Sequence, residues 1–190
     1  DVVEVTRTGS DLTISGNVTA TPIVLSLADV SQVRVVTVGG DDLVQGNANV
    51  YHSMQIRGGS GQDTLIGGSG DDTINGQTGD DSLVGGAGND TYAFTYNFGK
   101  DVIDEALDGG FDTIDLSAIA DQVVVSLDPN FVPPEEQADQ GFFDPEKIEQ
   151  ILTGPADDSI LFGTNTSLGS NGDGIVNGGA GANTLDYSRS

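Results

Sequence analysis

Four aspartates recur every nine residues in the middle of the chain, and each one closes a short glycine-rich stretch. They are Asp63, Asp72, Asp81 and Asp90. Carboxylates and backbone carbonyls are the oxygen ligands that hard cations such as Ca²⁺ and Mg²⁺ prefer. One short acid at the same place in every turn therefore predicts cation binding by repeated turns rather than by a single loop.

The aspartates belong to four nonapeptides that lie end to end over residues 58–93. Each copy has glycine at positions one and four, aspartate at position six and an apolar residue at position eight. The glycines are Gly58, Gly61, Gly67, Gly70, Gly76, Gly79, Gly85 and Gly88, and the apolar residues are Leu65, Ile74, Leu83 and Tyr92. Glycine allows a sharp bend that exposes carbonyl oxygens, and the last three residues form a minimal strand with one side chain toward the core. Two copies make one coil, which predicts an all-β, parallel β-solenoid.

The turns of such a solenoid alternate between two sides, so that Asp63 stacks on Asp81 and Asp72 on Asp90. Stacked strands lie about 4.8 Å apart, and two carboxylates at that distance repel by roughly 3 to 4 kcal/mol at an effective dielectric constant of about 20. A cation between the turns would remove this repulsion. Ca²⁺ accepts an irregular cage of carbonyls and carboxylates, whereas Mg²⁺ demands near-octahedral geometry and keeps its waters.

The nonapeptide resembles the Gly-Gly-x-Gly-x-Asp-x-apolar-x repeat of the RTX, or haemolysin-type calcium-binding, family. The resemblance implies a right-handed parallel β-roll with Ca²⁺ in its turns. It also implies calcium-dependent folding in a secreted or cell-surface bacterial protein that leaves the cell by type I secretion. One departure is Gln77 at position two, where the other three copies have glycine. If that position needs a positive φ angle, Gln77 strains its turn or the turn relaxes, and this repeat is then expected to bind calcium less well.

The resemblance further implies which residues face each calcium ion. One ion is expected between Gly59, Gly61 and Asp63 and Gly76, Thr78 and Asp81, and a second between Gly68, Gly70 and Asp72 and Gly85, Ala87 and Asp90. Two further ions would pair Gln77, Gly79 and Asp81 with Asp101, and Gly86, Gly88 and Asp90 with Asp112. The full set of predicted metal-site residues is Gly58, Gly59, Ser60, Gly61, Asp63, Gly67, Gly68, Ser69, Gly70, Asp72, Gly76, Gln77, Thr78, Gly79, Asp81, Gly85, Gly86, Ala87, Gly88, Asp90, Asp101 and Asp112.

Degenerate copies extend the repeat in both directions. A shorter Gly-x-Asp-x-apolar pattern recurs at Asp42, Asp101 and Asp112. Near the C-terminus the corresponding anchors are Asp158, Gly174 and Asn183, of which one alone is a carboxylate, so the roll-like backbone is expected there without a clear calcium site. We therefore expect four segments. They are N-terminal solenoid-like coils over 1–57, a calcium-binding β-roll over 58–116, a strand plus an acidic, proline-rich excursion over 117–152, and degenerate coils over 153–190.

Two details outside the repeats have alternative interpretations. Residues 148–152 could form a strand, as the family resemblance suggests, or a short helix capped by Asp144, Pro145 and Glu146. Phe142 and Phe143 could anchor the excursion to the roll or bind a partner, and anchoring is the more common role. The remaining turn aspartates are interpreted as solvated: Asp41, Asp71, Asp80, Asp104, Asp108 and Asp115.

The composition of the chain argues against several classes of partner and of activity. The chain of 190 residues has 30 acidic and 6 basic residues, a net charge of −24, which disfavours nucleic acid and anionic membranes as partners. Without cysteine and with one histidine, His52, it offers little to nucleophilic or imidazole catalysis, so we expect a non-enzymatic module. The alternatives are a polysaccharide-acting enzyme on a solenoid and an adhesive module that binds a surface glycan or protein through residues 128–146. Because the sequence begins at Asp1, we interpret it as a piece of a longer protein, whose remainder is a further expected partner.

Overall fold

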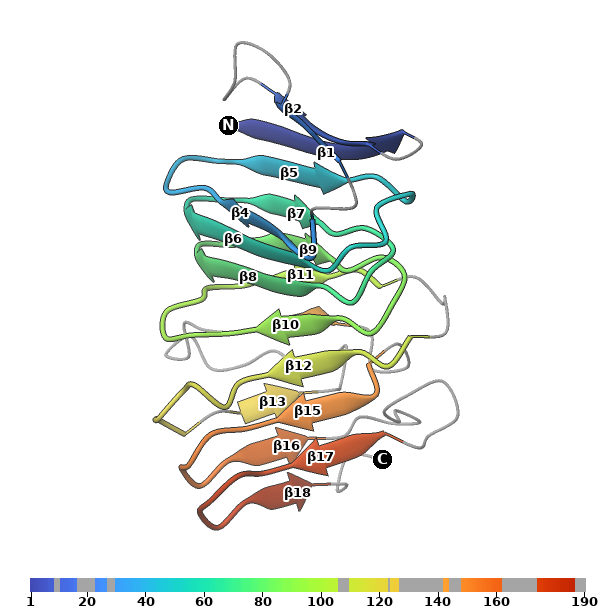
Figure 1. The fold of residues 1–190 in the computed structure, drawn as a ribbon. Coiled ribbons are helices and arrows are strands. Elements are labelled where there is room, and N and C mark those ends of the chain that lie inside the picture. The colour runs from blue at the N-terminus through green and yellow to red at the C-terminus, as the bar shows by residue number, and fades with distance from the viewer. Residues whose placement is uncertain are drawn as a thin grey trace.

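In a computed structural model the chain is a stack of β-strands (Figure 1). The structure describes residues 1–8, 11–16, 23–26, 30–105, 110–122, 124–126, 142–143, 148–161 and 174–186. The strands are β1 (Val2–Thr8), β2 (Asp11–Gly16), β3 (Ile23–Ser26), β4 (Val33–Val36), β5 (Leu43–Gly46), β6 (Met54–Ser60), β7 (Thr64–Ile66), β8 (Thr73–Thr78), β9 (Ser82–Val84), β10 (Thr91–Ala93), β11 (Val102–Ile103), β12 (Thr113–Asp115), β13 (Val124–Ser126), β14 (Phe142–Phe143), β15 (Gln150–Leu152), β16 (Ser159–Leu161), β17 (Ile175–Asn177) and β18 (Thr184–Asp186). Over these ranges the chain has no helix, and hence none that could cross a membrane.

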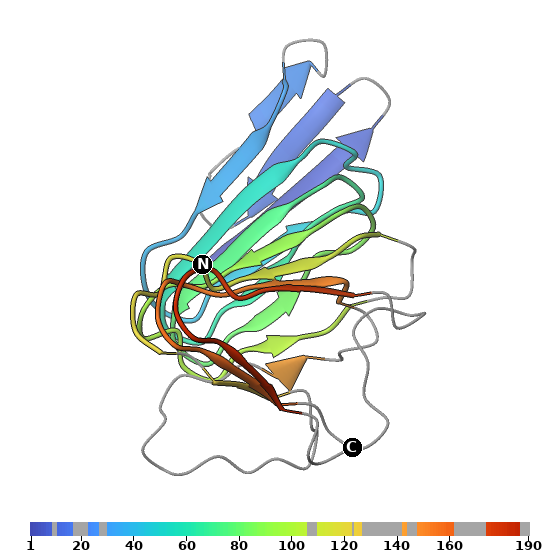
Figure 2. The same cartoon turned by 90° about the horizontal axis from the view of Figure 1, so that it is seen from below.

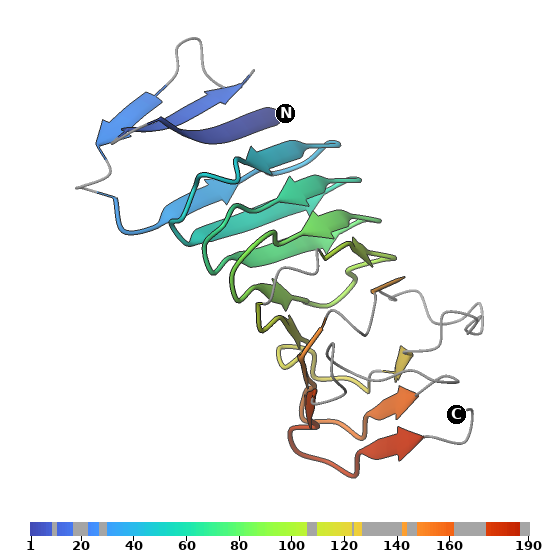
Figure 3. The same ribbon diagram turned by 90° about the vertical axis from the view of Figure 1, so that its right-hand side faces the viewer.

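Successive strands of the repeat region alternate between two sheets. Among the described strands one sheet has the order β14-β11-β9-β7-β5-β1-β2-β3, a second β17-β15-β12-β10-β8-β6-β4, and a third β13-β16-β18. Within the repeats every pairing is parallel, as between β7 and β9 or β8 and β10. From the side, the coils form rungs with a turn at either end (Figure 3), and seen along the stack their strands overlie one another (Figure 2). The predicted all-β parallel solenoid is therefore confirmed.

In the repeat region the core lies between the two sheets and is formed by the position-eight side chains. Leu65, Ile74, Leu83 and Tyr92 are all fully buried. Leu65 stacks on Leu83 and Ile74 stacks on Tyr92 in the strand registers. Burying one such side chain stabilises the fold by about 1.5 to 3 kcal/mol. Because each short strand of the repeats buries a single apolar side chain, the core contributes little stability to each coil. The turns therefore need stabilisation of their own.

The first three strands, within the segment 1–57 where solenoid-like coils are expected, pair mainly in antiparallel registers. β1 pairs with β2, and β2 with β3, in antiparallel registers, while β1 also pairs in parallel with β5. The sequence leaves two residues, Gly9 and Ser10, between β1 and β2, and so short a connection can join only antiparallel neighbours. A hairpin therefore continues the first sheet at this end. The division into four segments stays a prediction.

The structure decides between the alternatives given for residues 148–152 and for Phe142 and Phe143, over the part of these segments that it describes. Gln150–Leu152 is strand β15, in register with β12 and β17, and Ile151 is fully buried. The helix alternative is therefore wrong for these residues, and its proposed cap at 144–146 lies outside the described ranges. Phe142 and Phe143 pair with Val102 and Ile103 of β11, which confirms that this segment is anchored to the roll.

Candidate metal centre

The turns stack in the predicted pairs. The carbonyl oxygen of Gly61 lies where a Cβ on Gly79 would stand, and the carbonyl oxygen of Gly70 lies close to the Cβ position on Gly88. Turn 58–63 thus lies on turn 76–81, and turn 67–72 on turn 85–90. The next coil continues both stacks, because Gly99 lies against Gly79 and Gly110 against Gly88. The glycine-rich turns that the sequence assigned to metal binding are therefore brought together in space.

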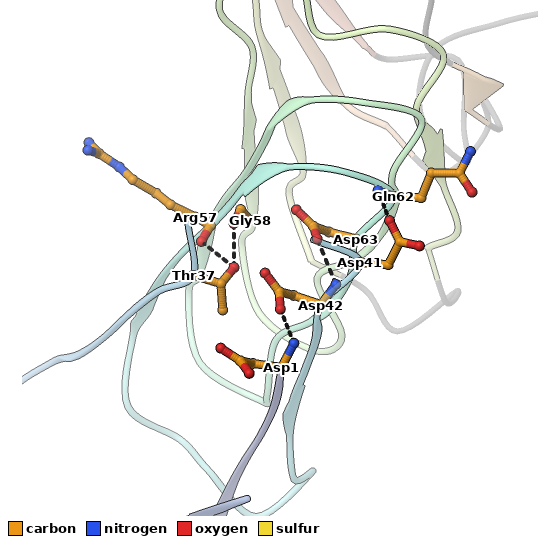
Figure 4. A network of polar contacts seen from close by, with 8 residues as sticks. All are labelled: Asp1, Thr37, Asp41, Asp42, Arg57, Gly58, Gln62 and Asp63. Carbon is orange, nitrogen blue, oxygen red and sulfur yellow. Dashed lines mark hydrogen bonds and ion pairs between the residues drawn. The ribbon is translucent and has the colours of Figure 1, made fainter. Parts of the chain in front are cut away.

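The position-six aspartates form an inner hydrogen-bond ladder through the stack. The backbone N–H of Asp63 donates to Oδ1 of Asp81, and that of Asp72 donates to Oδ1 of Asp90, each at 2.8 Å. The ladder also includes the degenerate copies, with bonds from Asp42 to Asp63, Asp81 to Asp101 and Asp90 to Asp112 (Figure 4 shows the first). The predicted stacking of the anchor carboxylates is thus observed.

The second carboxylate oxygen, Oδ2, of the anchor aspartates shows whether these turns suit a cation. Oδ2 of Asp63, Asp81 and Asp90 is buried and has no hydrogen-bond donor within the described part of the chain. Each lies against the position-one glycine of its own turn, 2.0 to 2.2 Å from where a Cβ on Gly58, Gly76 or Gly85 would stand. A side chain at position one would therefore displace the carboxylate. A buried anionic oxygen without a donor is costly unless a cation compensates it, so these turns fit Ca²⁺.

The remaining cation donors in these turns are backbone carbonyls. Across the described ranges no three His, Cys, Asp or Glu side chains come together as a metal-holding group. Each turn instead combines one carboxylate with carbonyls, such as that of Gly76, which lies 2.8 Å from the Cβ position on Gly58. Such mixed oxygen cages suit Ca²⁺, which takes about six to eight oxygen ligands in flexible geometry.

Burial raises the pKa of all four anchor carboxyls above the usual value of 3.8. It takes the pKa of Asp72 and of Asp81 to about 6 and that of Asp90 to about 8, and it also raises the pKa of Asp63. Neighbouring acids add to the effect at Asp90, where Asp72, Glu105 and Asp112 all act in the same direction. Without a cation the carboxyls of these turns thus hold a proton more tightly than an exposed aspartate does, and a bound cation would favour their ionised form.

Gln77 has a left-handed backbone conformation, with φ of 75°. Two of its glycine counterparts, Gly59 and Gly86, have φ of 117° and 104°, whereas the third, Gly68, does not have a positive φ. A non-glycine residue in this conformation costs roughly 1 to 2 kcal/mol. The positive φ on which the prediction of strain depended is thus observed at Gln77, and the Gln77 N–H donates to the Asn75 side chain at 2.9 Å.

Sequence analysis missed an outer ladder at position five. Oδ1 of Asp71 accepts a hydrogen bond from the Asn89 N–H at 2.8 Å, and Oδ1 of Asp80 accepts one from the Lys100 N–H at 3.0 Å. Asp41 does the same with Gln62 (Figure 4). These aspartates are exposed, as predicted, but each also links its turn to the following coil, whereas the inner ladder links back to the preceding one. Asp or Asn at position five in three of the four copies was the signal.

At the C-terminal end an amide takes the place of the anchor carboxylate. Oδ1 of Asn183 accepts from the Asp158 N–H at 2.9 Å, just as the anchor aspartates do. Its Nδ2 donates to the carbonyls of Gly178 at 2.5 Å and Ala180 at 3.2 Å. In the complete repeats the equivalent oxygens, at positions one and three, are candidate metal ligands. The amide therefore closes this turn without a cation.

We expect Asn183→Asp to make the C-terminal coil depend on calcium. The substitution keeps Oδ1 as an acceptor but replaces the donating amide with a second acidic oxygen. Hydrogen exchange of residues 175–177 and 184–186 measures the result. In the wild type their protection should be the same in chelator and in millimolar calcium. In the variant it should fall in chelator, and an unchanged pattern would contradict the role given to the amide.

Comparison with known proteins agrees with this geometry. Residues 57–92 match the RTX calcium-binding nonapeptide repeat, in four copies. No curated protein and no solved structure gives a significant match to the chain. Three of the four matched turns carry a buried, donor-free carboxylate oxygen, that of Asp63, Asp81 or Asp90. The chain thus contains an array of four RTX calcium-binding repeats, built into a parallel β-roll.

Proposed function

We propose that the chain is a calcium-binding β-roll module whose calcium-dependent folding stabilises a larger secreted or cell-surface protein. The observation that carries this proposal is the buried Oδ2 of Asp63, Asp81 and Asp90, which lacks a donor in each turn. The family match supports Ca²⁺ as the ion, because RTX nonapeptides are calcium-binding motifs.

The proposed ligands are those the sequence indicated. One ion lies between turns 58–63 and 76–81 and another between turns 67–72 and 85–90. Two more lie between these turns and the following coil, at Asp101 and Asp112. The inner ladder supports this set, because it places Asp81 between Asp63 and Asp101, and Asp90 between Asp72 and Asp112. The glycines and intervening residues would contribute carbonyl oxygens.

Calcium availability would then decide whether the module folds. An ion that binds only the folded chain adds about 2.7 kcal/mol at a hundredfold excess over its Kd, so a few ions rival the ~5 to 15 kcal/mol of a whole domain. Extracellular calcium modules work at Kd of ~10⁻⁴ to 10⁻³ M. Such a module stays unfolded where calcium is scarce and folds after export, which suits type I secretion.

The proposed role is non-catalytic. The adhesive alternative relied on residues 128–146, of which the structure describes Phe142 and Phe143 alone, and those two pair with the roll. The enzymatic alternative needs acids grouped with basic residues or histidine. The buried acids here instead act on one another, as the causes that raise the pKa of Asp90 illustrate.

Isothermal titration of the metal-free chain with CaCl₂ tests the proposal. We expect several ions to bind, with Kd values of ~10⁻⁴ to 10⁻³ M. MgCl₂ at the same concentrations serves as the control and should give little binding. Absence of calcium binding at millimolar concentration, or equal binding of both metals, would contradict the function proposed.

A further inference from the structure

Glu105 is a buried acid that the predicted calcium ligands do not include. Strand β9 is in register with β11, with Leu83 opposite Ile103, so that Glu105 lies opposite Gly85 in the next coil. It thus occupies the place of position one, where all four complete repeats have glycine. Its side chain is only 2% exposed. A carboxylate at this depth requires a partner of opposite charge or a proton.

The Glu105 carboxylate points back into turn 85–90. Its Oε1 accepts a hydrogen bond from the Gly85 N–H at 2.9 Å. It also lies 2.6 Å from the Cβ position on Gly85, and Oδ2 of Asp90 lies 2.2 Å from that same point. Asp90 is 1% exposed, and its Oδ2 has no hydrogen-bond donor within the described ranges. Two acidic oxygens from different coils therefore converge on one point inside the protein.

The surroundings of this point are acidic. The charged groups that act on Asp90 are Asp72, Glu105 and Asp112, and each raises its pKa rather than lowering it. Asp112 also contacts Asp90 directly, because its Oδ1 accepts the Asp90 N–H at 2.8 Å. A divalent cation at this point would neutralise two converging carboxylates at once, and Ca²⁺ takes carboxylate oxygens at about 2.3 to 2.6 Å.

We propose that Glu105 is a further calcium ligand, which joins Asp90 in closing the last complete calcium turn. This inference rests on the proposed function. The spacing sets this turn apart from the complete repeats. In turn 85–90 the anchor aspartate follows position one by five residues, whereas Asp112 follows Glu105 by seven. At the position where the complete repeats have glycine, Glu105 instead brings a carboxylate oxygen to turn 85–90.

The alternative is that Glu105 only accepts the hydrogen bond from the Gly85 N–H and binds no metal. Glu105→Gln separates the two roles, because the amide oxygen still accepts that hydrogen bond while the charge is lost. We expect the variant to bind one calcium ion at least tenfold more weakly than the wild type, in titration calorimetry. In chelator it should be as stable as the wild type or more so, since a buried charge has been removed. A hydrogen-bonding role alone predicts the same calcium isotherm.

The matched control is Asp104→Asn, which removes an exposed acid from the neighbouring residue and should leave the isotherm unchanged. Identical isotherms for Glu105→Gln and the wild type would overturn the inference. A wild type that binds no calcium would instead refute the proposed function. If Glu105→Gln does not fold in calcium, a crystal structure of the wild type grown in CaCl₂ decides. Ion density within about 2.3 to 2.6 Å of a Glu105 oxygen supports the inference, and its absence there refutes it.

Discussion

Removal of calcium at neutral pH is expected to abolish most of the strand signal of the repeat region. The coils bury a single apolar side chain per strand, and their inner ladder places buried carboxylates next to one another in every turn. Far-ultraviolet circular dichroism in chelator and in millimolar CaCl₂ measures the change. MgCl₂ is the control and should restore little of the signal. A full strand signal in chelator, unaltered by calcium, would show that folding does not depend on the metal.

Acid should partly replace calcium in the metal-free chain. A carboxyl whose pKa is raised by folding favours the folded state below its unfolded value of 3.8, and this stability is lost as the pH rises through the folded pKa. The folded pKa is about 6 for Asp72 and Asp81 and about 8 for Asp90. Urea unfolding in chelator should therefore show increasing stability as the pH falls from 8 toward 4. Stability that falls over this range would exclude the carboxyls as the cause of metal dependence.

The period of nine residues made the roll predictable, because each repeat sets both the position of its core side chain and the position of its glycine-rich turn. Leu65 and Leu83 had to stack once the coil length was set, and their register places Asp63 on Asp81. The stacked turns also explain why position one is glycine in every complete repeat. In all four complete repeats this glycine leaves room for the Oδ2 of its own anchor aspartate, rather than serving only to bend the chain.

The features that sequence analysis missed are those that do not follow the repeat. The β1–β2 hairpin depends on a two-residue connection, which alternation of apolar residues does not reveal. Glu105 was overlooked because the long turn before Asp112 hides its equivalence to Gly85 until the strand register is known. The outer ladder of Asp71 and Asp80 was interpreted as solvated because exposure and hydrogen bonding to the next coil were treated as exclusive.

Asp81→Asn should cause a large loss of calcium binding. Asp81 is central in the inner ladder, since it accepts from the Asp63 N–H and its own N–H donates to Asp101. The variant keeps Oδ1 as the acceptor and loses the charged, donor-free Oδ2. We expect both ions assigned to Asp81 to be weakened, in calorimetric titration. Asp71→Asn is the matched control, because it keeps the outer-ladder acceptor and removes an exposed charge worth ~1 kcal/mol or less.

The same substitution should change stability in the opposite sense when calcium is absent. Asn183 shows what an amide does at position six, where its Nδ2 donates to the carbonyl of the position-one glycine, Gly178. In Asp81→Asn an amide in the same orientation would reach the carbonyl of Gly76 and remove a buried charge whose pKa is raised to about 6. We therefore expect the variant to be more stable than the wild type in chelator and less stable in calcium. If Asp81→Asn and Asp71→Asn lose calcium equally, the chain binds calcium as a diffuse polyanion, and the stacked turns are not the sites.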